Sequence, residues 1–151
     1  VDSDDVTIAI LPFSNTKGDR KFDYLSEVFA VDLTEKLSHI DNISIKDFSI
    51  VKRVFQSVQA EESDMFDLSI AQQLGEKIKS KYVIYGTYLI MQQDIRITCF
   101  INNVSSNEID TSYRKSYDIA DFKHILNDFP NEIEKLVKSR NLVKKEDADA
   151  N

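Results

Sequence analysis

The segment Val6-Thr7-Ile8-Ala9-Ile10-Leu11-Pro12-Phe13 decides the fold class of this chain. Its apolar residues occupy both odd and even positions, and many of them are β-branched. This pattern predicts a central strand that is buried on both faces of a sheet. Pro12 has no backbone N–H and is expected to end the pairing. Residues 1–5 are polar and acidic and are interpreted as a disordered end or linker.

Helices and one short strand are predicted downstream of this segment. Apolar residues at helical spacing favour a helix over residues 23–40, with Asp23 as its N-cap. A short strand over 43–46, a short helix over 50–58 and a second amphipathic helix over 68–78 follow. Gly75 lies inside that last helix, where we expect it to permit close packing against a strand.

The second half of the chain predicts a three-stranded meander followed by helix. Residues 82–91, 95–102 and 109–117 favour strands, and polar turns separate them; Asn107 in the second turn can take the left-handed conformation. The apolar pattern of the final region is helical, but Pro130 is expected to break it and to start a second segment.

This order of elements predicts one α/β domain. We expect a mixed parallel and antiparallel sheet of about five strands, with helices packed mainly on one face. The helices over 23–40 and 68–78 are expected on that same face. The domain is predicted to span residues 6–138, and residues 139–151 to form a polar tail.

Composition excludes several classes of protein. The 151 residues include 42% hydrophobic and 30% charged residues, and the formal net charge of −7 makes general nucleic-acid binding unfavourable. The single Cys99 excludes an intramolecular disulfide and a cysteine-rich zinc site. No apolar run is long enough to span a bilayer, and no signal peptide is recognisable. We expect any membrane anchor to lie outside this chain.

No catalytic, cofactor-binding or metal-binding residue is predicted. The two histidines, His39 and His124, have no close-spaced ligand partner, and the three glycines are too far apart to form a phosphate-binding loop. Asp32 lies on the same helical face as apolar residues, so we expect a structural hydrogen bond there.

Two groups of residues are candidates for binding a protein partner. Tyr85, Phe100 and Tyr113 are spread over three strands that should be adjacent, so aromatic side chains are expected on the sheet face that the helices leave uncovered. Ile43 and Ile45 belong to a short strand that is a candidate edge strand, whose free N–H and C=O groups suit an incoming segment.

The order and spacing of four segments resemble the amino-terminal domain of TolB and its relatives. These segments are the first strand with its Leu-Pro-Phe ending, the Tyr-Leu-Ser-Glu start of the first helix, the second helix leading into a strand that ends in Gly, and the hairpin that follows. The motif residues are Leu11, Pro12, Phe13, Tyr24, Leu25, Asp32, Gly75, Tyr82 and Gly86. The chain departs from the family where Lys79 and Asn107 replace Gly, and where the polar stretch 110–112 replaces an aromatic residue.

The resemblance implies a non-enzymatic module that acts by protein–protein contact or assembly. Relatives include TolB-like domains fused to TPR proteins, adenylate cyclases and transcriptional regulators, and FlgO, CsgG-type and LpoB-type envelope lipoproteins. It therefore implies protein partners in the bacterial cell envelope, or the remaining domains of a larger protein. It also implies a periplasmic or outer-membrane-anchored location, with a cytoplasmic one as the alternative, and an oligomer is compatible with it. The alternative function is a regulatory domain that binds a small ligand near the end of the first strand, where α/β sheets often place ligands.

Overall fold

The computed structural model describes residues 5–16, 19–59 and 68–139. In chain order its elements are β1 (Val6–Ile10), β2 (Ser14–Asn15), the 3₁₀ helix η1 (Arg20–Phe22), α1 (Leu25–Leu37), β3 (Ile43–Ile45), α2 (Phe48–Gln59), α3 (Leu68–Ile78), β4 (Tyr82–Met91), β5 (Asp94–Asn103), β6 (Glu108–Asp118) and α4 (Phe122–Ser139). The predicted linker and polar tail lie outside the described residues, apart from Asp5 and Ser139.

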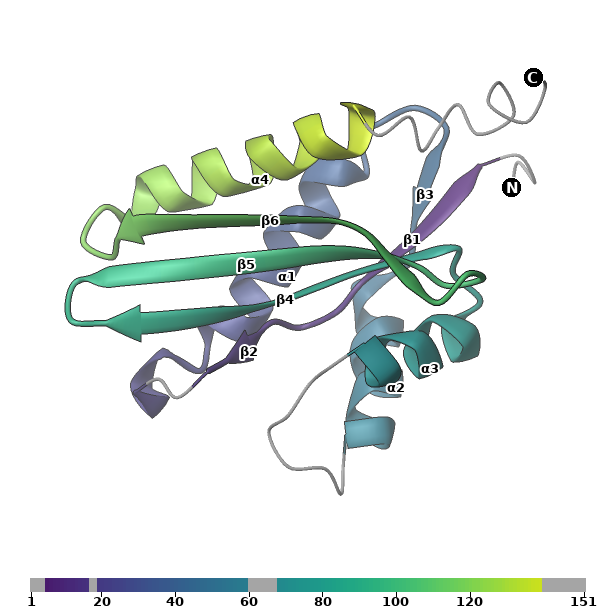
Figure 1. Ribbon diagram of the computed structural model, residues 1–151, viewed down its shortest axis with the longest axis horizontal. Coiled ribbons are helices and arrows are strands. Elements are labelled where there is room, and N and C mark those ends of the chain that lie inside the picture. Colours follow the sequence, from purple (N-terminus) through teal and green to yellow (C-terminus); the bar gives the residue numbers. More distant parts are fainter. Residues whose placement is uncertain (1–4, 17–18, 60–67, 140–151) are drawn as a thin grey trace.

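The sheet is mixed, and its strand order is β3-β1-β4-β5-β6 (Figure 1). β3, β1 and β4 are parallel, whereas β4, β5 and β6 form the predicted antiparallel meander. The two-residue strand β2 also pairs with β4, in a segment predicted as loop. The predicted α/β class and mixed sheet are therefore confirmed, and β3 and β6 are the edges of the described sheet.

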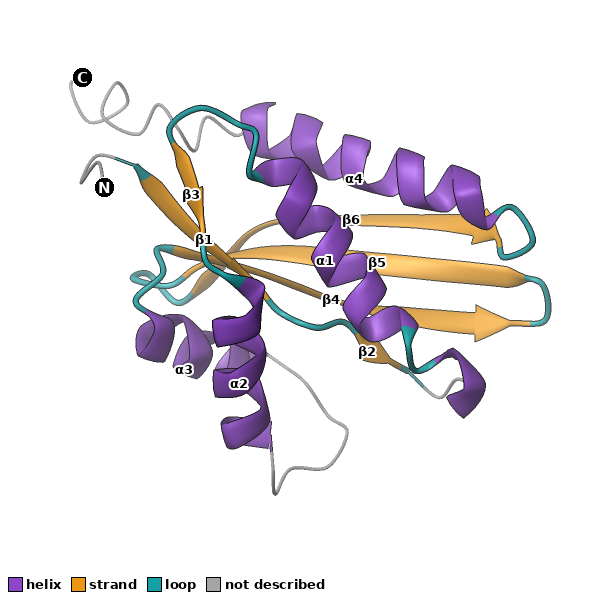
Figure 2. Ribbon diagram, turned by 180° about the vertical axis from the view of Figure 1, so that it is seen from behind, coloured by secondary structure: helices purple, strands orange, loops and turns teal. Residues whose placement is uncertain are grey.

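Two hydrophobic cores lie on opposite faces of the sheet. Successive residues of β1 and the following Leu11 alternate between them, so that Ile8 and Ile10 pack with α1 and α4, whereas Ala9 and Leu11 pack with α2 and α3. Figure 2 shows α1 and α4 lying across one face of the long strands, with α2 and α3 at the end where β1 and β3 lie. The burial of β1 on both faces is thus confirmed.

The predicted placement of the helix over residues 68–78 is wrong. Its side chains Ala71 and Leu74 pack in the core opposite to that of α1, not on the same face. A further correction concerns the start of α1. The N-cap of α1 is Tyr24, which makes no side-chain capping bond, rather than Asp23.

The predicted break at Pro130 is also wrong, because α4 runs through it. Pro130 removes one backbone N–H from the helix, which costs roughly one hydrogen bond. Phe129 and Ile133, on either side of it, are buried in the core of α1 and α4. Burial of this continuous apolar stripe offsets the lost bond and keeps the helix in one piece.

Both glycines of the family motif lie where another backbone or side chain comes very close. A Cβ on Gly75 would lie 2.5 Å from a methyl group of Val104 and 2.9 Å from one of Val83, which confirms the predicted close packing of α3 on a strand. A Cβ on Gly86 would meet the backbone carbonyl of Thr98 and, at 2.7 Å, the ring of Phe13. Gly86 therefore leaves room for the aromatic residue that ends the Leu-Pro-Phe motif.

Candidate functional site

One face of the antiparallel meander is covered by described helices only at the end where Val83, Tyr85 and Phe100 pack against α2 and α3. Alternate side chains of β4, β5 and β6 belong to the core beneath α1 and α4, so the intervening side chains point the other way. Figure 1 looks onto this surface, with α1 behind the strands. We call it the open sheet face; its residues are Thr87, Leu89, Met91, Asp94, Arg96, Thr98, Phe100, Ser112, Arg114, Ser116 and Asp118.

The structure brings together two of the three predicted aromatic residues. Tyr85 and Phe100 are cross-strand partners whose rings stack 5.2 Å apart on the face of α2 and α3. Tyr85 is buried and Phe100 is half-buried. Tyr113 lies on the other face, 6.2 Å from the ring of Phe129 in α4. Aromatic side chains therefore lie on both faces: Tyr113 packs beneath α4, and Tyr85 and Phe100 lie on the face expected to be uncovered, where Tyr85 is buried against α2 and α3.

The predicted edge strand is found as an edge, but its apolar side chains point inward. β3 pairs with β1 on one side and has no other strand partner among the described residues. Ile43 is buried and Ile45 half-buried, both against the core of α1 and α4. Only the backbone of this short strand is therefore available for an incoming segment.

Arg96 and Arg114 are the basic residues of the open sheet face, and neither is among the candidates that the sequence pattern indicated. The register pairs Arg96 with Ser116 and Thr98 with Arg114, which makes the two arginines diagonal neighbours on one face. Both are exposed, and neither has an ion-pair partner in the described part of the chain. In the sequence, Arg96 alternates with the apolar Ile95 and Ile97, and this period of two indicates that Arg96 points away from the core.

A polar cluster fastens β6 to α4 behind this face. The Asp128 carboxylate accepts hydrogen bonds from the Tyr117 hydroxyl at 2.8 Å and from Lys115 Nζ at 2.9 Å. These two donors, Lys115 first, lower the pKa of Asp128. Burial and the neighbouring carboxylate raise the pKa of Tyr117, so its hydroxyl remains a donor. Because Arg114 lies next to Lys115, this cluster helps to hold the arginine's strand in place.

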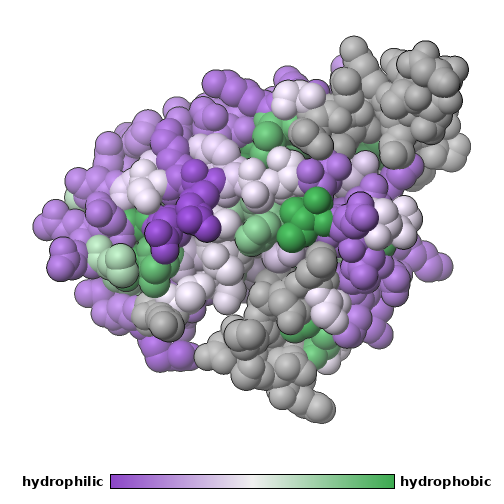
Figure 3. Space-filling model, in the orientation of Figure 1, coloured by the Kyte–Doolittle hydropathy of each residue, from purple (hydrophilic) through white to green (hydrophobic). Residues whose placement is uncertain are grey.

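Figure 3, in the orientation of Figure 1, shows the character of the open sheet face. Strongly hydrophilic atoms lie directly beside hydrophobic ones over the strands. Met91 has 59% of its surface exposed, and Leu89 is half-buried. Charged and apolar groups are thus available side by side on a surface of ordered backbone.

A second feature is a cleft at the carboxyl end of β1. It has a volume of about 480 Å³ and is lined by Pro12, Asp23, Tyr24, Ser26, Glu27, Lys52, Phe55 and Gln56. Lys52 Nζ of α2 and Glu27 Oε2 of α1 form an ion pair of 2.7 Å across it. Tyr24 is exposed, whereas Pro12 is buried at the base of the cleft.

The topology explains why the cleft forms there. β1 and β3 are parallel neighbours, and the helices that follow them, α1 and α2, pack on opposite faces of the sheet. Diverging connections of this kind leave a crevice outside the carboxyl ends of the strands, which is where α/β sheets bind ligands.

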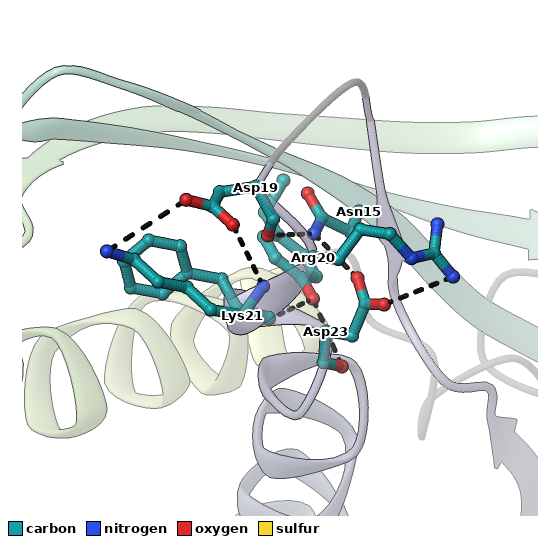
Figure 4. Close-up of polar contacts among 7 residues, drawn as sticks. Asn15, Asp19, Arg20, Lys21 and Asp23 are labelled. Carbon is teal, nitrogen blue, oxygen red and sulfur yellow. Dashed lines mark hydrogen bonds and ion pairs between the residues drawn. The ribbon is translucent and has the colours of Figure 1, made fainter.

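A network of polar contacts holds the chain between β2 and α1 at one side of this cleft (Figure 4). The Asn15 amide donates to Asp23 Oδ1 at 2.8 Å and to the Asp19 carbonyl at 3.2 Å. Arg20 lies 3.5 Å from the other oxygen of Asp23, and the Asp19 carboxylate caps η1 by accepting from the Lys21 N–H at 3.1 Å. Asp23 is therefore engaged with the loop and does not cap α1.

The remaining chemically active side chains are dispersed. Cys99 is fully buried, and burial raises the pKa of its thiol. Both histidines are exposed: His39 follows the end of α1, and His124 lies in α4. Burial and the neighbouring Glu35 raise the pKa of Asp32, and the hydrogen bond expected for Asp32 is not among the contacts of the described residues. The described residues contain no group of His, Cys, Asp or Glu suited to a metal ion, and no described helix is long and apolar enough to cross a membrane.

The other motif residues serve the fold. Leu11, Leu25 and Tyr82 are buried, and Gly75 and Gly86 provide the close contacts described above. The nearby Tyr88, also fully buried, donates its hydroxyl to the Phe22 carbonyl at 2.8 Å and so fastens β4 to η1. These residues explain the shared architecture rather than a binding activity.

Comparison with known proteins places the chain by its fold. No family model and no curated protein matches its sequence. Among solved structures, it is similar to the LpoB C-terminal domain from Escherichia coli, with a TM-score of 0.55 and 13% identity over 75% of this chain and 82% of that one. It is similar to lipoprotein GNA1162 from Neisseria meningitidis, with a TM-score of 0.54 and 13% identity over 75% and 80%.

TolB from Acinetobacter baumannii also matches, with a TM-score of 0.53 and 10% identity. The match covers 90% of this chain but 28% of TolB, so it concerns one part of that protein. Identities this low show the fold alone. The resemblance predicted from the sequence is confirmed at that level: this chain has the fold of the LpoB C-terminal domain and of the matching part of TolB.

Proposed function

We propose that this chain is a non-enzymatic protein-interaction module that binds its partner through the open sheet face. The observation that carries the proposal is the contrast between the two faces of the meander: α1 and α4 lie along one, whereas α2 and α3 cover the other only at the end that holds Val83, Tyr85 and Phe100. An ordered surface that combines exposed apolar and charged residues suits protein recognition. The fold likeness to LpoB and to lipoprotein GNA1162 supports a role of this kind.

The module belongs, in this proposal, to a bacterial envelope protein that is periplasmic or anchored to the outer membrane through a segment outside this chain. The proposal rests on the family resemblance and on the likeness to a lipoprotein. Fractionation of cells that express the full-length gene product tests it. Recovery of the protein in the cytoplasmic fraction alone would reject the envelope location.

Position-specific photo-crosslinking in living cells tests the binding surface. A photoreactive residue at Ser116, exposed on the open sheet face, should crosslink the full-length protein to one discrete partner. The same residue at Glu35, exposed on α1, should not. A crosslink to a second copy would identify the partner as the protein itself and show an oligomer. Crosslinks from Glu35 alone, or from neither position, would contradict the proposal.

The cleft at the carboxyl end of β1 supports a second candidate function, the binding of a small ligand. Its volume lies in the range of ligand pockets, and its position is the one that the topology favours. A thermal-shift screen of metabolites should find a compound that raises the Tm of the wild type. The compound should not raise the Tm of Ser26→Arg, in which a longer side chain fills the cleft. Equal shifts in both proteins would exclude this site.

A further inference from the structure

Arg96 and Arg114 form a pair of cationic groups without partners on an acidic protein. The net charge of the chain is −7, so carboxylates outnumber basic groups. Seven other described basic residues form ion pairs, for example Lys52 with Glu27 and Lys115 with Asp128, whereas Arg96 and Arg114 belong to those that form none. Neither guanidinium on the open sheet face has such a contact. Two adjacent cations repel each other, so an arrangement of this kind is stabilised when an anion binds between them.

The surroundings of the pair show where an anionic group would lie. Asp94 and Asp118 are a cross-strand pair on the same face, one step beyond Arg96 towards the β4–β5 turn. On the opposite side of the pair, the register places Thr98, Phe100 and Ser112, which carry no charge. A carboxylate is therefore favoured between the arginines and Phe100, away from the two aspartates.

The chemistry of the neighbours favours a polypeptide as the anion. Guanidinium groups bind carboxylates through paired hydrogen bonds, and the hydroxyls of Thr98 and Ser112 can donate to the same oxygens. Leu89 and Met91 offer apolar area next to the arginines. A nucleic acid would be repelled by the net charge of −7. A segment with alternating acidic and apolar side chains matches both kinds of group on a strand surface.

We infer that Arg96 and Arg114 receive the carboxylates of an acidic, extended segment of the partner protein. This inference rests on the proposed function and adds the chemistry of the partner. The exposed arginines then act as the specific contacts of the surface, and the apolar residues beside them contribute buried area.

The test uses a synthetic peptide that alternates glutamate with valine, and its glutamine counterpart as the neutral control. Amide chemical shifts of the domain are followed by NMR during titration at low salt. The glutamate peptide should shift Thr87, Arg96, Thr98 and Arg114, and binding should weaken as salt is added. The double variant Arg96→Gln/Arg114→Gln should bind the glutamate peptide at least about tenfold more weakly than the wild type. The matched variant Lys123→Gln/Lys135→Gln, with both changes on α4, should bind like the wild type.

Each other outcome overturns the inference. These outcomes are no binding of the glutamate peptide, equal binding of the glutamine peptide, shifts confined to other surfaces, or an arginine variant that binds like the wild type. If a duplex oligonucleotide gave the same shifts at lower concentration, the ligand of this surface would be a nucleic acid and not an acidic protein segment. All four altered residues are exposed, and thermal melting of each variant confirms that it is folded.

Failure here is distinguishable from failure of the proposed function. If Ser116 crosslinks a partner in cells but the arginine variants leave that crosslink unchanged, the open sheet face binds protein and the acidic chemistry of the partner is wrong. If neither Ser116 nor the peptide reports contact, both proposals fail together.

Discussion

Lys79 ends α3 in a conformation that glycine adopts more readily. Its φ is 64°, in the left-handed region. The Lys79 N–H donates to the Glu76 carbonyl at 3.2 Å, and the Ser80 N–H donates to the Gly75 carbonyl at 2.9 Å. This is the Schellman pattern, whose left-handed position is usually glycine. The resemblance drawn from the sequence puts glycine at this position, yet the cap forms with lysine.

Replacing Lys79 by glycine should stabilise the domain. A non-glycine residue in the left-handed region carries a steric cost of roughly 1 kcal/mol, which Lys79→Gly removes. We expect the free energy of unfolding, measured by urea denaturation, to rise by about 1 kcal/mol. Lys79→Ala is the control and should give no comparable gain, because alanine keeps the Cβ. A destabilised glycine variant would contradict this account of the cap.

At the scale of elements, β6 and α4 are joined by the contact of Tyr117 with Asp128. The hydrogen bonds to Asp128 lower its pKa in the folded protein relative to an unfolded aspartate, near 3.9. A lowered folded-state pKa gives a stabilisation that is complete above the unfolded pKa. It is lost as the pH falls through the folded pKa. The contact is therefore expected to weaken only in acid.

Asp128→Ala should lower the free energy of unfolding at neutral pH by about 1–2 kcal/mol, because it removes the acceptor of the buried Tyr117 hydroxyl. The difference between wild type and variant should shrink as the pH falls below about 4. Denaturation curves across this pH range measure it. A difference that stays constant down to pH 2 would show that the ionised carboxylate is not the stabilising group.

Some of the elements and their arrangement could be predicted, and others could not. The two-sided apolar pattern of β1 and the alternation of β5 correctly indicated a central strand and a meander. They do not contain the strand order. The connection from β1 to β3 and the connection from β3 back to β4 run in opposite directions along the sheet. Because both are right-handed, their helices lie on opposite faces. Without that order, α3 was expected on the face of α1. The predicted break at Pro130 was wrong because burial of Phe129 and Ile133 outweighs the local preference of proline for helix ends.

The candidate site was less predictable for the same reason. Which aromatic residues share a face depends on strand register, and the pairing of Cys99 with Tyr113 places Tyr113 beneath α4. Whether Arg96 and Arg114 have ion-pair partners depends on tertiary neighbours that no sequence pattern shows. The edge position of Ile43 and Ile45 followed from the shortness of their strand.

The two cores give a direct test of the fold. Ile10 and Leu11 are adjacent and both fully buried, but they belong to different cores. Ile10→Ala and Leu11→Ala should each lower the free energy of unfolding by about 2–5 kcal/mol, as truncations in a packed core do. Denaturation midpoints measure both. If either substitution left the midpoint unchanged, the face on which that residue lies would not be covered as described.

At the scale of the whole molecule, the sheet is protected unevenly. β1 and β4 are central strands with helices on both faces at their paired ends, whereas β6 is an edge strand with many exposed residues. Amides that open only on global unfolding exchange most slowly, and edges exchange through smaller openings. Hydrogen exchange should therefore be slowest at Ile8–Ile10 and at Tyr82–Ile84, and clearly faster over Arg114–Asp118. Binding of a partner to the open sheet face should slow exchange in β5 and β6 and leave β1 unchanged. Equal protection of β6 and β1 in the free protein would contradict the arrangement of two cores around one central pair of strands.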